Sequence, residues 1–273
     1  MRRSRFAAAA VVLVLVSAVI LYARATEPQP PRRADGRSTT VVLELFTSQG
    51  CSSCPPADRL LTALGGERRD GAVVIPLAYH VDYWDHLGWK DPFSSASWSA
   101  RQNRYAASLG SAQVYTPQLI VNGTTQLVGN DERAVRRAIE RQLAAGNRGV
   151  VFIDRLTREG RVVRVDAHAA LEGPAKGSSS RAGLEVIAAL FQNGITTAVV
   201  AGENGGRKLA DDYIVRWEAP AFALGIGARE AHGTVAIPVD AAWSGGDLGV
   251  VLFLQDRASR SIYGAVSQRV PTR

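Results

Sequence analysis

The sequence has 273 residues, 46% of them apolar, which is longer than one typical domain and suits two. This composition excludes a disordered or fibrous protein. The formal charge of +7 comes from dispersed residues, almost all Arg, without a basic tract or an aromatic-interleaved patch, so we expect no nucleic-acid partner.

The first 25 residues are typical of an export signal. Residues 1–5 are basic, residues 6–23 form an uncharged apolar run, and Ala23-Arg24-Ala25 offers a small-x-small cleavage site. We therefore expect an extracytoplasmic chain, periplasmic or secreted. The alternative is an uncleaved membrane anchor, because the run 6–23 is just long enough to span a bilayer. Residues 26–38, rich in Pro and Arg, are interpreted as a flexible linker.

The only two cysteines, Cys51 and Cys54, follow an apolar run that predicts a buried strand over residues 41–46. Structural disulfides in exported proteins commonly join distant cysteines, because long loops gain more stabilisation, so the Cys-x-x-Cys spacing favours a redox-active pair. Residues 51–64 predict a helix whose N-terminus would lower the pKa of the Cys51 thiol. The alternative is that helical hydrogen bonding begins only near Pro55, because Pro55 and Pro56 disfavour helical geometry before them. Cys51 is then the nucleophile and Cys54 the resolving thiol, with Ser52 and Ser53 supplying exposed donors around the sulfur.

A second buried strand is expected over residues 72–79, and an aromatic and acidic stretch, 80–93, follows it directly. Strand ends are where α/β sheets build their sites, so His80, Asp82 and Trp84 are candidates for a rim beside the cysteines. His80 is nearest to the strand end and is expected closest to the thiols. The alternative is a loop held by buried aromatic residues. Residues 94–109 predict a helix that ends at Gly110.

Asn122-Gly123, between two β-rich runs, predicts a hairpin with a tight turn. Thr116-Pro117 stands at the entry of the first hairpin strand. Pro117 has no N–H to donate to a strand ladder, so we expect it to be an entry residue or one with a special role. A helix is expected over residues 131–145, capped at its N-terminus by the Asn-Asp-Glu run and ended by Gly146.

The order of these segments, with Cys-x-x-Cys before a helix and Thr-Pro entering a hairpin, resembles the thioredoxin fold over residues 39–146. The resemblance implies a cis Thr116–Pro117 peptide placed against Cys51, where the adjacent backbone pairs with the substrate. The runs LFTSQGCSSCPPAD, HVDYW and YTPQLIVNG are similar to a bacterial secreted, thioredoxin-like family of unknown function, domain of unknown function 1223. Leu45 stands where thioredoxin has a buried acid, so the sequence assigns no proton relay.

Short β-rich runs separated by turn signals continue from residue 150 to residue 266. They predict a sandwich of about eight strands. The expected fold is therefore an α/β thioredoxin-like domain (39–146) followed by an all-β sandwich-like domain (147–273). His168 and His232 have no ligand-spaced partner in the sequence and are interpreted as structural residues.

The predicted function is exported thiol–disulfide oxidoreductase, acting on a protein or small-molecule disulfide or dithiol without a cofactor. Cys51 and Cys54 would carry the chemistry. A copper carrier is the alternative, with Cys51, Cys54 and His80 as a soft metal site, and a redox-inactive binding module is a third hypothesis. The predicted substrate-binding residues are Ser52, Ser53, His80, Asp82, Trp84, Thr116 and Pro117.

Overall fold

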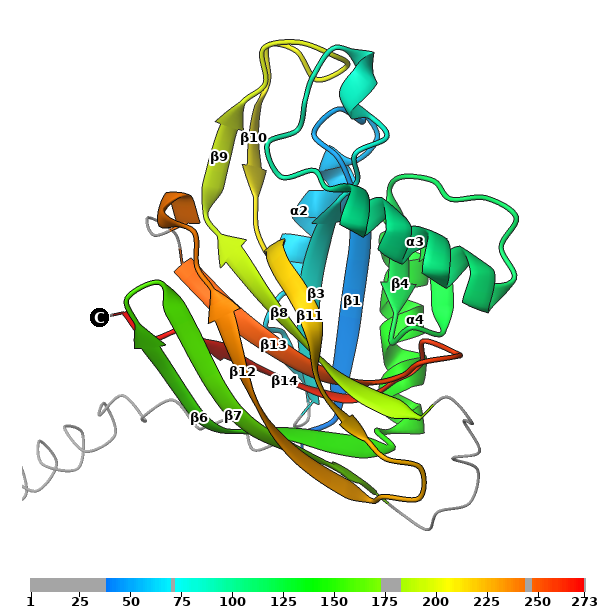
Figure 1. Cartoon of the computed structure of the whole chain (residues 1–273). Helices are drawn as coiled ribbons and strands as arrows, with labels where there is room; N and C mark the ends of the chain where they lie inside the picture. Colours follow the sequence, from blue (N-terminus) through cyan, green and yellow to red (C-terminus); the bar gives the residue numbers. More distant parts are fainter. Residues whose placement is uncertain (1–37, 70–71, 173–182, 244–246, 273) are drawn as a thin grey trace, which may run out of the picture. The chain divides into compact units, whose positions relative to one another are not determined.

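The computed structural model describes residues 38–69, 72–172, 183–243 and 247–272 (Figure 1). The predicted export signal (1–25) and nearly all of the predicted linker lie outside these residues. Within the described residues, no helix is both long and apolar enough to cross a membrane.

The first half of the described chain alternates strands and helices much as the sequence predicts. The Asn122-Gly123 turn has positive φ at both residues, 47° and 67°, as a tight hairpin turn requires. The elements of this first half are β1 (Thr40–Thr47), α2 (Pro55–Leu64), β2 (Arg68–Arg69), β3 (Ala72–His80), η1 (Asp85–Leu87), α3 (Ala96–Leu109), β4 (Gln118–Val121), β5 (Thr125–Val128) and α4 (Glu132–Ala145).

The second half is almost entirely β-structure, and the short runs noted in the sequence become strands with somewhat different ends. A further strand, β10, was not expected. The elements are β6 (Gly149–Glu159), β7 (Val162–Leu171), β8 (Leu184–Asn193), β9 (Ile195–Ala198), β10 (Lys208–Asp211), β11 (Ile214–Leu224), β12 (Glu230–Pro238), η2 (Ala241–Trp243), β13 (Asp247–Asp256) and β14 (Ile262–Arg269).

The expected architecture, a thioredoxin-like domain followed by a separate β-sandwich domain, is wrong. One mixed sheet runs through both halves of the described chain in the order β14-β13-β8-β11-β3-β1-β4-β5, with β2 beside β3. The halves join where Ile214 of β11 pairs with Ala78 of β3. The sequence pattern missed this because periodicity identifies strands without showing which strands pair.

The apolar cores confirm that the large sheet is shared. On one face, α2 and α4 cover β1, whose Val41, Leu43 and Leu45 point toward them. On the other face, Val42 and Phe46 of β1 lie in one core with Ile187 of β8 and Phe253 of β13. A residue from the first half therefore packs directly with residues from the last strands, which two independent domains would not allow.

A smaller sheet, β12-β7-β6, covers the second half of the large sheet (Figure 1). Alternate residues of β7, from Val163 to Ala169, are buried between the two sheets. The residues between them point to the opposite face. Strands β9 and β10 form a separate two-stranded ribbon.

A buried ionic cluster also joins the two halves. Arg101 of α3 lies between Glu44 of β1, at 2.6 Å, and Glu218 of β11, at 2.9 Å. Tyr79 donates to the Glu218 carboxylate and Tyr105 to the Glu44 carboxylate. Buried charges are stable only when paired and hydrogen-bonded, so this cluster fixes α3 against both parts of the sheet.

Candidate functional site

Cys51 and Cys54 form a disulfide in the loop between β1 and α2. The loop is built from two successive turns, in which Cys51 N–H donates to Ser48 O and Cys54 N–H donates to Cys51 O. The helix begins only at Pro55, so the residue at its N-cap is Cys54. The expectation that Cys51 lies at the helix N-terminus is therefore wrong by one turn, because Pro55 and Pro56 confine the helical hydrogen bonding to later residues.

Both cysteines are fully buried, whereas Ser52 and Ser53 between them are exposed. The Ser53 hydroxyl lies 3.3 Å from the Cys51 sulfur. The exposed serines are therefore the part of the Cys-x-x-Cys segment that faces solvent.

The loop between β9 and β10 holds the cysteine loop in place. Asn204, itself fully buried, donates from Nδ2 to the backbone oxygens of Gln49 and Cys51, at 2.9 and 3.0 Å. The exposed Glu203 carboxylate accepts from the Ser52 N–H at 2.9 Å. The Gly-Glu-Asn-Gly-Gly run of this loop is compatible with a contact loop, but it is also typical of any surface turn, so the sequence does not connect it with the cysteines.

Trp84 links the cysteine loop to the Thr-Pro segment. Its indole N–H donates to the Thr116 hydroxyl at 2.8 Å, and its Cβ lies close to Gly50, where an added Cβ would approach to 3.2 Å. The Thr116–Pro117 peptide is cis, as the sequence resemblance implied, and Pro117 is buried. Trp84 and Thr116 are thus brought together beside the residue that precedes Cys51.

A cluster of ionisable side chains, Asp58, His80, Asp91 and Asp211, lies under the cysteine loop. Buried His80 pairs with Asp91 at 2.7 Å. Gln49 donates from its backbone N–H to Asp91 and from its side chain to Asp211, at 2.8 and 2.7 Å. The cluster is therefore tied to the cysteine loop through Gln49, two residues before Cys51.

The charges of this cluster shift one another's proton affinities. Burial and the Asp211 carboxylate raise the pKa of Asp58 to about 7. Burial alone would lower the pKa of His80, but Asp91 and Asp211 outweigh it and raise this pKa to about 9. Asp58 lies one helical turn after Cys54 and accepts a hydrogen bond from Thr47 at 2.8 Å. Residues four apart share a helix face, so Asp58 lies on the same side of α2 as Cys54.

Asp58 was not among the predicted site residues. The sequence pattern could have indicated it, because an acid four residues after a cysteine at a helix start lies on the same helix face as that cysteine. Among the predicted residues, Asp82 exchanges two hydrogen bonds with Ser99 of α3: its backbone N–H donates to the Ser99 hydroxyl, which donates to its carboxylate. Asp82 thereby anchors its own loop. His80 contributes to the buried cluster through Asp91, so its role there is electrostatic.

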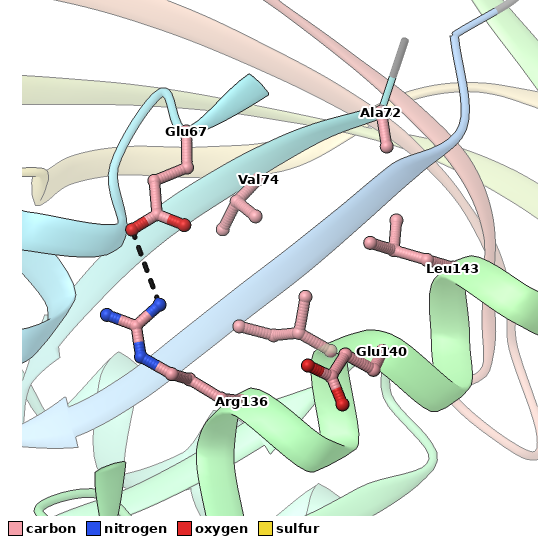
Figure 2. A pocket seen from close by; sticks show the side chains of 7 residues that line it. Glu67, Ala72, Val74, Arg136, Glu140 and Leu143 are labelled. Atoms are coloured by element: carbon pink, nitrogen blue, oxygen red, sulfur yellow. Dashed lines mark hydrogen bonds and ion pairs between the residues drawn. The ribbon is translucent and has the colours of Figure 1, made fainter. Parts of the chain in front are cut away.

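A small, mostly apolar pocket lies between β3 and α4, far along the strand from this site (Figure 2). Ala72 and Val74, at the start of β3, line it, whereas His80 ends that strand. An ion pair between Arg136 and Glu67 spans its edge at 3.5 Å. The pocket does not include the cysteines.

A family model described as "Protein of unknown function (DUF1223)" matches residues 42–255. The chain is a member of the DUF1223 family. The match spans both halves of the large sheet, which agrees with their common core. No curated protein sequence matches the chain.

Two solved structures resemble this DUF1223 protein over most of its length. A structural-genomics protein from Agrobacterium tumefaciens is 28% identical, with a TM-score of 0.60, covering 85% of this chain and 95% of that one. HBP35 of Porphyromonas gingivalis is 17% identical, with a TM-score of 0.66, covering 85% of this chain and 76% of that one. The second likeness shows a shared fold alone.

Proposed function

We propose that this protein carries out thiol–disulfide exchange through Cys51 and Cys54. The observation that supports this most is the position of the disulfide, directly before α2 and one turn from Asp58, whose pKa is about 7. In the chain-entropy model, so short a disulfide loop stabilises by only about 2 kcal/mol, against about 4.7 for a loop of roughly 100 residues. Exchange chemistry explains the spacing better than stabilisation does. The export signal expected in residues 1–25 agrees, since disulfides persist outside the cytosol.

In the reduced protein, the Cys51 thiolate attacks one sulfur of a substrate disulfide, and the other substrate sulfur leaves as a thiolate. Cys54 then attacks the Cys51 sulfur of the mixed disulfide, which releases the second substrate thiol and forms the disulfide present here. Asp58, as a carboxylate, accepts the proton that Cys54 loses. The same steps run backward when the oxidised protein meets a substrate dithiol.

Exchange requires access to Cys51, which is buried. The hydrogen bonds between the cysteine loop and the loop that joins β9 to β10 are few: the Asn204 amide with two backbone oxygens and Glu203 with Ser52. One more bond, from the Gln49 side chain to Asp211, comes from β10 itself. We propose that displacement of this loop opens the site to substrate. Glu203 and Ser52 are exposed, so their bond is the first that an arriving chain would replace.

The test compares Cys54→Ser with Cys51→Ser in the exported protein. Cys54→Ser leaves the attacking thiol and removes the resolving one, so it should accumulate mixed disulfides that dithiothreitol releases. Cys51→Ser is the matched control and should accumulate none. The purified wild-type protein should also speed the reduction of a model disulfide by dithiothreitol.

Equal trapping by the two variants would contradict the assigned roles. The absence of trapping, together with no acceleration of model-disulfide reduction, would show that the disulfide is structural. Copper content of the reduced protein, compared with the double variant Cys51→Ser/Cys54→Ser, tests the carrier hypothesis in the same preparations.

A further inference from the structure

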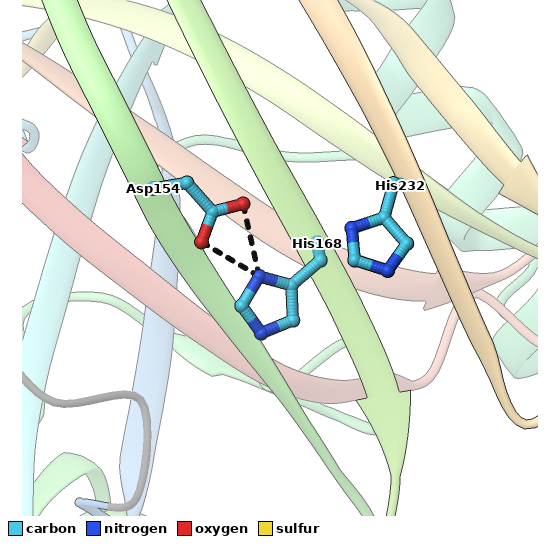
Figure 3. A group of neighbouring side chains, drawn as sticks. All are labelled: Asp154, His168 and His232. Carbon is cyan, nitrogen blue, oxygen red and sulfur yellow. Dashed lines mark hydrogen bonds and ion pairs between the residues drawn. The ribbon is translucent and has the colours of Figure 1, made fainter.

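A second group of potential ligands lies on the small sheet, on the face that points away from the large sheet. Its members are Asp154 of β6, His168 of β7 and His232 of β12 (Figure 3). In the sequence they are separated by 14 and 64 residues, so neither histidine has a partner there at the spacing of metal ligands. We propose that they form a binding site for a divalent transition-metal ion of the zinc type.

The strand register brings the two histidines together. His232 of β12 pairs directly with His168 of β7, and Phe152 of β6 pairs with His168 from the other side. The His168 ring therefore stacks on both neighbours, with centroids 4.6 Å from Phe152 and 5.3 Å from His232. Because β7 is the central strand, His168 is fixed in the middle of the site.

A bulge in β6 supplies the carboxylate. The register shifts between Ile153 and Arg155, so Asp154 is an extra residue without a partner in the ladder. Such bulges reorient side chains. Asp154 reaches His168 Nδ1 with both carboxylate oxygens, at 2.8 and 3.0 Å. A metal ion bound between these two groups would replace this hydrogen bond.

The donor set suits zinc in number and type. Two imidazoles and one carboxylate are the protein ligands of open zinc sites, where water completes the coordination. The three ligand atoms lie within 4.8 Å of one another. Bonds of about 2.0–2.1 Å in a tetrahedron place donor atoms roughly 3.4 Å apart, so closure requires shifts of the order of 1 Å. The His232 side chain is 68% exposed and free to turn by that amount.

A carboxylate that can orient one of the histidines is also in position. Glu230, two residues before His232 on the same strand face, lies 3.1 Å from His232 Nε2. Metal-ligating histidines commonly donate their other ring N–H to a carboxylate, which fixes the tautomer and ring direction. A metal at His232 Nδ1 would keep Glu230 in this role. The exposure of Asp154 and His232 leaves the remaining positions of the ion to water.

The test is titration of zinc into tag-free, chelator-treated protein in the oxidised form, because a disulfide offers no thiolate ligand. We expect one ion per chain by calorimetry at pH 7.5. His232→Gln should weaken binding by at least about tenfold, because even the loss of a residue that only orients a ligand costs about tenfold to a hundredfold. His86→Gln is the matched control, since His86 is also exposed but lies in η1, and it should bind like the wild type.

Cobalt provides a second readout that does not depend on affinity alone. The visible absorption of bound Co²⁺ reports nitrogen and oxygen ligation, and it should change in His232→Gln and in Asp154→Asn. Equal zinc affinity in His232→Gln and wild type, or no saturable binding at micromolar zinc, would overturn the proposal. Because these two side chains are largely exposed, neither variant should unfold the sheet, and thermal melting checks this.

Discussion

His80 should make the stability of the protein fall between pH 7 and pH 9.5. Its folded pKa is about 9, against 6.5 for a free imidazole, because Asp91 and Asp211 outweigh the effect of burial. The folded state therefore binds more protons than the unfolded state in this range, so stability decreases as the pH rises. The contribution is fully present below pH 6.5 and is lost as the pH passes through about 9.

The expected size follows from the same two pKa values. Between pH 7 and pH 9.5, an imidazole with pKa 6.5 unfolded and about 9 folded loses about 2 kcal/mol of stabilisation. Asp58 acts in a lower window, because its pKa rises from 3.8 to about 7, so its ionisation lowers stability mainly below pH 7. Unfolding measurements at pH 7 and above therefore report mainly the titration of His80, and little of that of Asp58.

The assay is urea unfolding at several pH values, followed by tryptophan fluorescence, for wild type and His80→Gln. Glutamine can still donate to Asp91 but does not titrate, so the variant should lose most of the decrease above pH 7. His86→Gln controls for the loss of an exposed histidine and should keep the wild-type slope. A wild-type slope in His80→Gln would refute the role given to the His80–Asp91 pair.

Three further changes test the rest of the structure. Arg101→Met leaves the Glu44 carboxylate buried without its cation, and should cost about 3–5 kcal/mol in urea unfolding. Asn204→Ala removes two hydrogen bonds from the cysteine loop, and should lower stability by about 1–3 kcal/mol and speed reduction of the disulfide by dithiothreitol. Asp58→Asn should slow thiol exchange by about a hundredfold and remove the inflection near pH 7 from its rate profile. Unchanged reduction in the second variant, or an unchanged pH profile in the third, would contradict the proposed loop opening or proton transfer.

The local features of the cysteine site were predictable from the sequence. Cys51 and Cys54 are the two cysteines of the sequence, and Asn122 and Gly123 are residue types that readily adopt the positive φ angles of the tight turn that the hairpin needs. The cis peptide before Pro117 followed from the family resemblance. Each of these depends on neighbouring residues, and so appears in a short stretch of sequence.

Other features of the two sites depend on contacts between segments that are distant in the sequence. Asn204 is far from Cys51 in the chain, and nothing in its own turn indicates that its amide closes the cysteine loop. Likewise, His168 and His232 meet only because β7 pairs with β12 in one particular register. A shift of one residue would send one ring to the opposite face.

The sequence by itself therefore determined the disulfide spacing, the cysteine part of the site, the helices and the strands, apart from β10 and the exact ends of several elements. The tertiary structure decided that the strands of both halves form one sheet, through the pairing of β11 with β3 and the shared buried charge of Arg101. The physical reason is that periodicity records which face of a strand is buried, whereas strand order depends on which buried faces and polar groups satisfy one another across the whole chain.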